Sequence, residues 1–239
     1  RALCDALREA AEASGLPADF AQLMESREDV AAMLKEDALI DLIIPRGSNA
    51  FVRYIMDNSR IPVLGHADGI CHVYVDKAAD LPMAVKIAVD SKAQNVAVCN
   101  AMETLLVHAD VAENYLPPLA EAMREAGVHL KGDAQTRAII PCEAATEEDW
   151  STEYLDYILS IRVVDSLDAA IDHINRYGSH HTDCIVTQDD QAAAAFLTRV
   201  DSAGVYRIVS TRFADGFVYG FGAEVGLRQE KFTPGGLWG

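Results

Sequence analysis

Cys99 is the residue of this sequence whose type and position most clearly suggest chemistry. It follows the short apolar stretch 95–98, and the Asn100 and Glu103 that come after it have the spacing of a helix-capping box. Apolar residues continue from Met102 with the i, i+3, i+4 spacing of one helix face. We therefore predict a strand over 95–98 and a helix with Asn100 as its N-cap, which places Cys99 at the positive end of that helix.

A thiol at such a position can act as a nucleophile. Unpaired backbone N–H groups at a helix start favour an anion, and they lower the pKa of a cysteine from about 8.5 to within ~3.5–7.5. The same N–H groups stabilise an oxyanion on a carbonyl that the sulfur attacks. We take Cys99 and Asn100 as the candidate catalytic residues. The spacing alone leaves a second interpretation open, in which Cys99 is a small buried hydrophobe.

The other cysteines show no pairing pattern. They are far apart and include no C-x-x-C pair, which argues against a disulfide framework and against a zinc site, so we expect no bound metal. These cysteines are Cys4, Cys71, Cys142 and Cys184. We therefore expect the protein to belong to a reducing, cytoplasmic compartment.

The composition is that of a globular protein with small-molecule partners. The 239 residues are 50% hydrophobic and 24% charged, and the net charge of −17 repels a phosphate backbone. No apolar run approaches the ~20 residues that span a bilayer. The segment 1–15 is predicted to form a charged amphipathic helix and not a signal peptide. Neither nucleic acid nor a membrane is an expected partner.

Strand-like and helical segments alternate along the chain. A buried strand over 39–45, a turn "RGSN", a helix over 50–59 and a strand over 61–65 together predict one βαβ unit. We therefore predict an α/β fold with a parallel sheet. Further strands are expected at 71–76, 157–165, 183–189 and 204–210, and further helices at 1–14, 27–37, 81–94, 116–127, 166–178 and 191–200.

Several segments together resemble one known family. "VCNAMETLLVH", "DLIIPRGSNAFVRYI", "GHADGICHVYVD", "STEYLDYILSIRVVD", "VDSAGVY", "STRFADGF" and "GFGAEVG" resemble segments of the gamma-glutamyl phosphate reductases, in the same order, from about residue 35 to 226. That family belongs to the aldehyde dehydrogenase superfamily. The resemblance implies an aldehyde dehydrogenase-like fold, with residues 1–70 as part of a dinucleotide-binding domain, 71–212 as the catalytic domain and 213–239 as a tail.

The resemblance also implies an activity. It is the NADPH-dependent reduction of L-glutamyl 5-phosphate to the semialdehyde in proline biosynthesis, by an enzyme expected to be a homo-oligomer. Cys99 matches the family's nucleophile, which forms a thioester as phosphate leaves. The other site residues that the resemblance implies are Pro45, Arg46, Gly47, Ser48 and Glu153 for the cofactor, and His181, Thr182, Ser210, Thr211 and Arg212 for the substrate.

This sequence also departs from the family pattern. Arg207 and Ile208 stand where a valine and an asparagine are expected, and the segment 227–239 differs, with Lys231 retained and Trp238 unexpected. The chain is also shorter than the family at both ends. These departures favour an alternative, a non-catalytic homologue that serves oligomerisation or partner binding.

A third hypothesis is a thiol hydrolase or acyltransferase in which a histidine activates Cys99. His108 would lie roughly 13 Å away along the predicted helix, too far for a hydrogen bond, whereas His181 stays open.

Overall fold

The computed structural model describes residues 1–17, 19–65 and 68–222, and the chain divides into two compact units. The first unit is Arg1–Gly65 and the second begins at His66. Each unit has its own buried apolar cluster, so we describe each by itself. Among the described residues, no helix has both the length and the apolar character that a membrane crossing requires.

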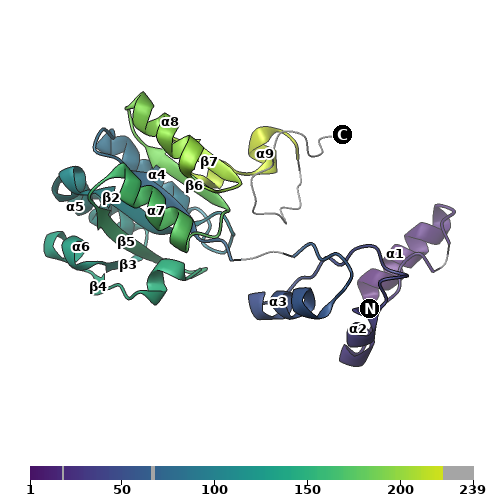
Figure 1. Cartoon of the computed structure of the whole chain (residues 1–239). Coiled ribbons are helices and arrows are strands. Elements are labelled where there is room, and N and C mark those ends of the chain that lie inside the picture. The colour runs from purple at the N-terminus through teal and green to yellow at the C-terminus, as the bar shows by residue number, and fades with distance from the viewer. Residues whose placement is uncertain (18, 66–67, 223–239) are drawn as a thin grey trace. The chain divides into compact units, whose positions relative to one another are not determined.

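The first unit contains three helices, α1 (Ala2–Ala13), α2 (Arg27–Met33) and α3 (Asn49–Asn58) (Figure 1). The sequence analysis predicted all three, as helices over 1–14, 27–37 and 50–59. Ser26 and Asp29 form a reciprocal capping box at the start of α2. The small core of this unit consists of Leu34, Ile43, Ile55 and Ile61.

The two strands predicted in this unit are not formed as strands. Within the described residues they reduce to one parallel bridge between Ile43 and Val63. Its hydrogen bonds run from Ile43 N to the Pro62 carbonyl (2.9 Å) and from Leu64 N to the Ile43 carbonyl (2.8 Å). Leu42 and Ile44 beside the bridge are 46% and 59% exposed. The predicted buried strands are therefore wrong beyond this bridge, because the described residues of this unit supply no further sheet neighbours that would extend them.

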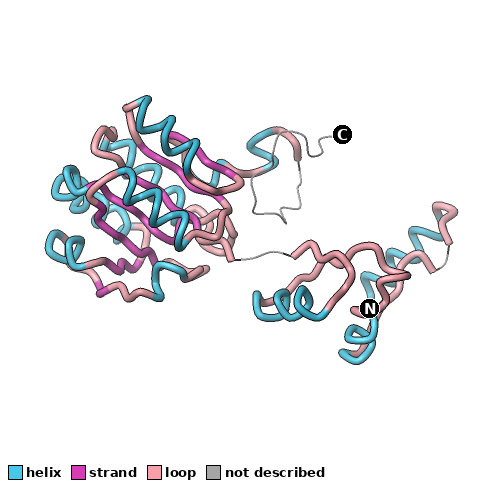
Figure 2. The backbone as a smooth tube through the Cα atoms, viewed as in Figure 1, coloured by secondary structure: helices cyan, strands magenta, loops and turns pink. Residues whose placement is uncertain are grey.

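The second unit is built on one parallel sheet, which confirms the predicted α/β class (Figure 2). Its order is β4-β3-β5-β2-β1-β6-β7, and every pair of neighbours is parallel. The strands are β1 (Cys71–Val75), β2 (Met102–His108), β3 (His129–Gly132), β4 (Glu143–Ala144), β5 (Ile158–Val164), β6 (Thr182–Val186) and β7 (Gly204–Arg207).

Helices cover both faces of this sheet (Figure 1). One face packs against α4 (Leu81–Ala93), α5 (Ala109–Glu125) and α6 (Ala134–Ile139), in a cluster that includes Tyr115 and Leu116. The other face packs against α7 (Leu167–Tyr177) and α8 (Asp190–Arg199), through residues such as Ile171 and Phe196. As predicted, Ser166 caps α7 and Gly178 ends it. The short helix α9 (Gly216–Tyr219) follows the last strand.

The helix predicted from Asn100 onward is wrong, because 102–108 is the central strand β2. All of its side chains are buried, since β1 and β5 flank it and helices cover both of its faces. A strand buried on both faces is continuously apolar, so it also contains i, i+3, i+4 matches. The helix begins at Ala109, where His108 Nδ1 accepts a hydrogen bond from Asp110 N (3.1 Å). The stretch 95–98, predicted as a strand, forms turns.

Candidate active site at the amino edge of the sheet

The predicted catalytic and substrate residues of the second unit gather at one edge of the sheet. Because all strands are parallel, their amino ends lie together. Cys99 precedes β2, Glu153 precedes β5, and His181 immediately precedes β6. Open α/β sheets usually bind ligands at the carboxyl ends of their strands. Here the candidate chemistry lies at the opposite edge.

Cys99 is exposed, while its backbone is held from two sides. The Cys71 thiol donates a hydrogen bond to the Cys99 carbonyl (3.3 Å), and burial raises the pKa of Cys71, which keeps this donor protonated. Gly69 lies directly against Cys99, since a Cβ on Gly69 would be 2.0 Å from the Cys99 carbonyl oxygen. The thiol therefore reaches solvent from a fixed loop. It does not lie at a helix start, so the predicted position of Cys99 at the positive end of a helix is wrong.

Arg212 supplies a positive charge next to this loop. Its Nη1 donates a hydrogen bond to Asn100 Oδ1, and its Nε donates to Gln94 Oε1 (3.0 Å). Asn100 is buried, and its Nδ2 donates to the Ala214 carbonyl (2.8 Å). Asn100 is therefore not the N-cap that its spacing predicted. Its side chain instead joins the residue after Cys99 to a guanidinium.

The segment 210–214 is attached to the last turn of α4. Ser91 Oγ donates to Ser210 Oγ (3.2 Å) and accepts from Thr211 N (3.1 Å). Thr211 is fully buried, and within the described residues its hydroxyl has no partner. Two of the predicted substrate residues, Ser210 and Thr211, thus bond to α4 and hold the segment that carries Arg212.

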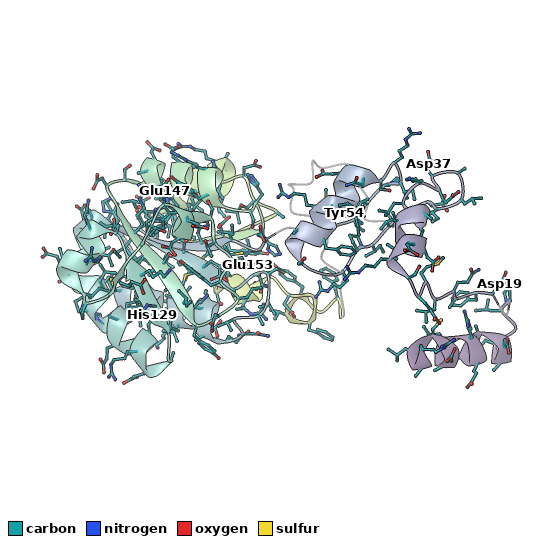
Figure 3. All side chains as sticks on the ribbon, turned by 90° about the horizontal axis from the view of Figure 1, so that it is seen from below. Asp19, Asp37, Tyr54, His129, Glu147 and Glu153 are labelled. Carbon is teal, nitrogen blue, oxygen red and sulfur yellow. The ribbon has the colours of Figure 1, made fainter. Side chains whose placement is uncertain are left out.

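Glu153 is joined to the Cys99 loop through Gly69. The Glu153 carboxylate accepts a hydrogen bond from Gly69 N (2.8 Å), and Glu153 is labelled in Figure 3. Because Gly69 packs on the backbone of Cys99, the predicted cofactor residue and the predicted nucleophile belong to one connected site.

Lys92 and Glu103 form a buried ion pair that the sequence analysis missed. Lys92 Nζ donates to Glu103 Oε2 at 2.5 Å, and both side chains are fully buried. Burial raises the pKa of Glu103 to about 7 and lowers that of Lys92, because a buried charge loses its hydration. A glutamate inside "METLLVH" could have revealed the pair, since a charged residue is almost never fully buried without a partner.

The two histidines considered as partners of Cys99 lie at opposite edges of the sheet. His181 Nδ1 and Thr182 Oγ1 are 2.8 Å apart at the amino edge, and Thr182 is buried. Burial lowers the pKa of His181, so it is neutral near pH 7. His108 lies at the carboxyl end of β2, about 20 Å of strand away from Met102. A Cys99–His108 pair is excluded, although by strand geometry and not by the predicted helix.

The two departures from the family pattern lie at the end of β7. Arg207 donates to the Thr187 carbonyl (3.1 Å) and to Asp190 (2.7 Å), so it joins β7 to the start of α8. Ile208 has φ +57°. This left-handed conformation is unfavourable for a β-branched residue and easier for asparagine, so the departure adds backbone strain. The divergent tail, including Lys231 and Trp238, lies outside the described residues.

The predicted cofactor turn lies in the first unit, at the entrance to α3. Ser48 caps this helix, with its Oγ accepting from Phe51 N (3.4 Å), and Gly47 before it has φ +155°. Pro45 is buried, whereas Arg46 is exposed. Within the described ranges, no group of three or more His, Cys, Asp or Glu side chains could hold a metal ion.

Comparison with known proteins places these features in context. Residues 2–156 match the model of the aldehyde dehydrogenase family. The chain is 62% identical over 231 residues to a gamma-glutamyl phosphate reductase of Pelotomaculum thermopropionicum, covering 97% of this chain and 53% of that protein. It superposes on the crystal structure of gamma-glutamyl phosphate reductase from Thermotoga maritima with a TM-score of 0.92 and 40% identity, covering 97% of this chain and 56% of that one.

A more distant structure shares only the fold. It is glyceraldehyde-3-phosphate dehydrogenase from Methanocaldococcus jannaschii complexed with NADP, with a TM-score of 0.68 and 17% identity over 89% of this chain and 56% of that one. The chain spans about half the length of the curated relatives it matches.

Proposed function

Because the chain belongs to the aldehyde dehydrogenase family, we propose that it is the part of a gamma-glutamyl phosphate reductase that carries the nucleophile. The reaction is the reduction of L-glutamyl 5-phosphate to L-glutamate 5-semialdehyde with NADPH, in proline biosynthesis. The relatives' names and high identity support the substrate, and the exposed Cys99 on a fixed loop supports the mechanism.

In the proposed reaction, Cys99 acts as a thiolate. The sulfur attacks the acyl phosphate carbonyl, the C–S bond forms, and the C–O bond to phosphate breaks, so that inorganic phosphate leaves with the electron pair. The resulting thioester accepts a hydride at carbon. Its collapse breaks the C–S bond and releases the aldehyde together with the thiolate. Phosphate is a good leaving group, so an activating base matters less than in a hydrolytic reaction.

The residues proposed for the nicotinamide nucleotide fit its chemistry. A glycine turn that leads into a helix start suits a phosphate, and α3 after Gly47 and Ser48 provides this arrangement. A carboxylate such as that of Glu153 suits ribose hydroxyls. When bound, NADPH supplies the hydride. Ser210 and Thr211 support Arg212, and His181 and Thr182 complete the proposed substrate side of the edge.

Turnover by the polypeptide that contains residues 1–239 tests this function. We expect NADPH oxidation that requires glutamyl phosphate and releases one phosphate per NADPH oxidised. The reverse reaction should need semialdehyde, phosphate and NADP together. Release of free glutamate without NADPH consumption would instead indicate a thiol hydrolase. A folded preparation without turnover in either direction would indicate a non-catalytic module.

Arg212→Lys is expected to lower kcat/KM for glutamyl phosphate by about 10- to 100-fold. Lysine keeps the charge but cannot hold Asn100 and Gln94 at once in the planar fork of a guanidinium, and hydrogen bonds to charged groups contribute ~1.5–3 kcal/mol each. Steady-state kinetics check this. A larger effect on KM indicates contact with the substrate, and a larger effect on kcat indicates positioning of Cys99.

The matched control is Arg199→Lys, because Arg199 pairs with Asp168 on the surface. It should leave both kinetic constants unchanged. A wild-type value of kcat/KM in Arg212→Lys would contradict a role for the Arg212 guanidinium in the reaction.

A further inference from the structure

The buried Lys92–Glu103 pair has no part in the proposed reaction, yet it contacts the residues that follow Glu153. Its side chains are 0% exposed, and Lys92 Nζ is 2.5 Å from Glu103 Oε2. Replacing a buried ion pair by apolar residues of similar volume is often neutral or stabilising. Stability alone therefore does not account for the pair, and its other contacts indicate what it does.

Both members of the pair contact the segment 153–155. Lys92 Nζ lies 5.8 Å from the ring centroid of Tyr154, and Glu103 Oε1 accepts a hydrogen bond from Leu155 N (3.4 Å). The Tyr154 hydroxyl is held from the other side, at 2.7 Å from both Asp149 Oδ1 and Ser160 Oγ. The segment is thereby fixed between α4 and β2 on one side and β5 on the other.

The backbone of this segment needs such support. Leu155 has φ +52°, in the left-handed region that a leucine adopts only at a cost of about 1–2 kcal/mol. Such a conformation persists only where surrounding contacts hold it. The contacts from Lys92 and Glu103 to Tyr154 and Leu155 are of this kind.

Glu153 is the first residue of this segment. Glu153 accepts the hydrogen bond of Gly69 N at 2.8 Å, and Gly69 packs against the backbone of Cys99. A continuous series of contacts therefore runs from Glu103 through Leu155 and Glu153 to Gly69 and the Cys99 loop.

We propose that the buried Lys92–Glu103 pair is a positioning unit, which holds the segment 153–155 so that Glu153 keeps Gly69 seated against Cys99. Neither residue touches the reacting atoms. This proposal rests on the site of the proposed function, but it concerns the arrangement of that site and not its turnover.

Amide hydrogen exchange in the whole chain tests the proposal without an activity assay. The variants are Lys92→Met with Glu103→Met, which removes the acceptor for Leu155 N, and Lys92→Met with Glu103→Gln, which keeps an acceptor oxygen. We expect exchange at Leu155 and at the remote Gly69 to rise about tenfold in the Met/Met variant. In the Met/Gln variant, the exchange rates of both amides should return toward the wild-type values. Amides of β6 provide the reference.

Stability and positioning should change in opposite directions in these two variants. The Met/Gln variant buries an amide whose N–H groups have lost their partner, so it should be the less stable of the two in urea. It should nevertheless protect Gly69 better. If the pair were only structural, the exchange rate of Gly69 would follow the free energy of unfolding, and it would be faster in the less stable Met/Gln variant.

Two outcomes would overturn the proposal. The first is Gly69 exchange in the Met/Met variant that stays at the wild-type rate while Leu155 exchanges faster. The second comes from a substitute experiment, for the case that the Met/Met variant fails to fold. In that experiment amide exchange is measured on the wild-type chain in low urea. There Gly69 and Leu155 should open together with one free energy, because coupled segments exchange as a unit. Separate opening would contradict the proposal, whether or not the protein reduces glutamyl phosphate.

Discussion

Replacing Cys99 by serine is expected to lower kcat for glutamyl phosphate reduction by about 10³-fold or more, with little loss of stability. A serine hydroxyl is not ionised near neutral pH, and a nucleophile that cannot form the covalent intermediate loses most of the rate. A 10³-fold loss corresponds to about 4 kcal/mol of transition-state stabilisation. Cys99 is exposed, so the loss of the sulfur leaves no cavity in the core.

The measurement pairs NADPH oxidation with thiol labelling. Cys142→Ser is the matched control, because Cys142 is half-buried beside α5 and α6 and lies outside the site, so its turnover should stay within about twofold of wild type. Alkylation of the wild-type chain near neutral pH should modify Cys99 well before the other cysteines. Residual turnover of Cys99→Ser above a tenth of wild type would point to another nucleophile.

Most helices and strands of the second unit were predictable because their signals are local. Ser166 and Gly178 mark the ends of α7 in the sequence, and capping chemistry acts within a few residues. The elements β3, β4 and α6, of 4, 2 and 6 residues, were not predicted. A helix period is measured over windows of 11–18 residues, so α6 is too short to show one, while β4 has only two residues and β3 contains a single large apolar side chain, Leu130.

The type assigned to 102–108 was wrong for a different reason. The choice between helix and buried strand for an apolar run depends on its tertiary partners, and the strands that pair with β2, which are β1 and β5, are separated from it in the sequence by other elements. Thr104 and Val107 are β-branched and favour a strand, whereas the helix prediction rested on the capping pattern of Asn100 and Glu103 and on the apolar spacing.

The candidate site was only partly predictable because its contacts are remote in sequence. Arg212 and Asn100 are 112 residues apart, and Gly69 and Glu153 are 84 apart. A local pattern cannot pair such residues. The resemblance to a family identified Cys99 as the candidate nucleophile, whereas the spacing around it suggested a helix start that does not exist. Gly69 instead packs on the Cys99 backbone, and Arg212 bonds to the side chain of the next residue, Asn100.

Gly69→Ala is the second substitution with a large expected effect, because Gly69 has no room for a side chain. A Cβ there would lie 2.0 Å from the oxygen, 2.5 Å from the Cα and 2.6 Å from the carbonyl carbon of Cys99. All three are backbone atoms, so the Cys99 loop itself must move. A displacement of about 1 Å in a catalytic group can cost ~10²-fold in rate, and overpacking typically costs 1–3 kcal/mol of stability.

Gly127→Ala separates the loss of stability from the loss of chemistry. Gly127 has φ +74° and no atom within 4 Å of its added Cβ, so alanine there costs about 1–2 kcal/mol through backbone strain alone. Urea unfolding should therefore show comparable losses for both variants, whereas kcat should fall about 100-fold only for Gly69→Ala. If Gly69→Ala keeps wild-type kcat, the close packing of Gly69 on Cys99 does not set the position of the thiol.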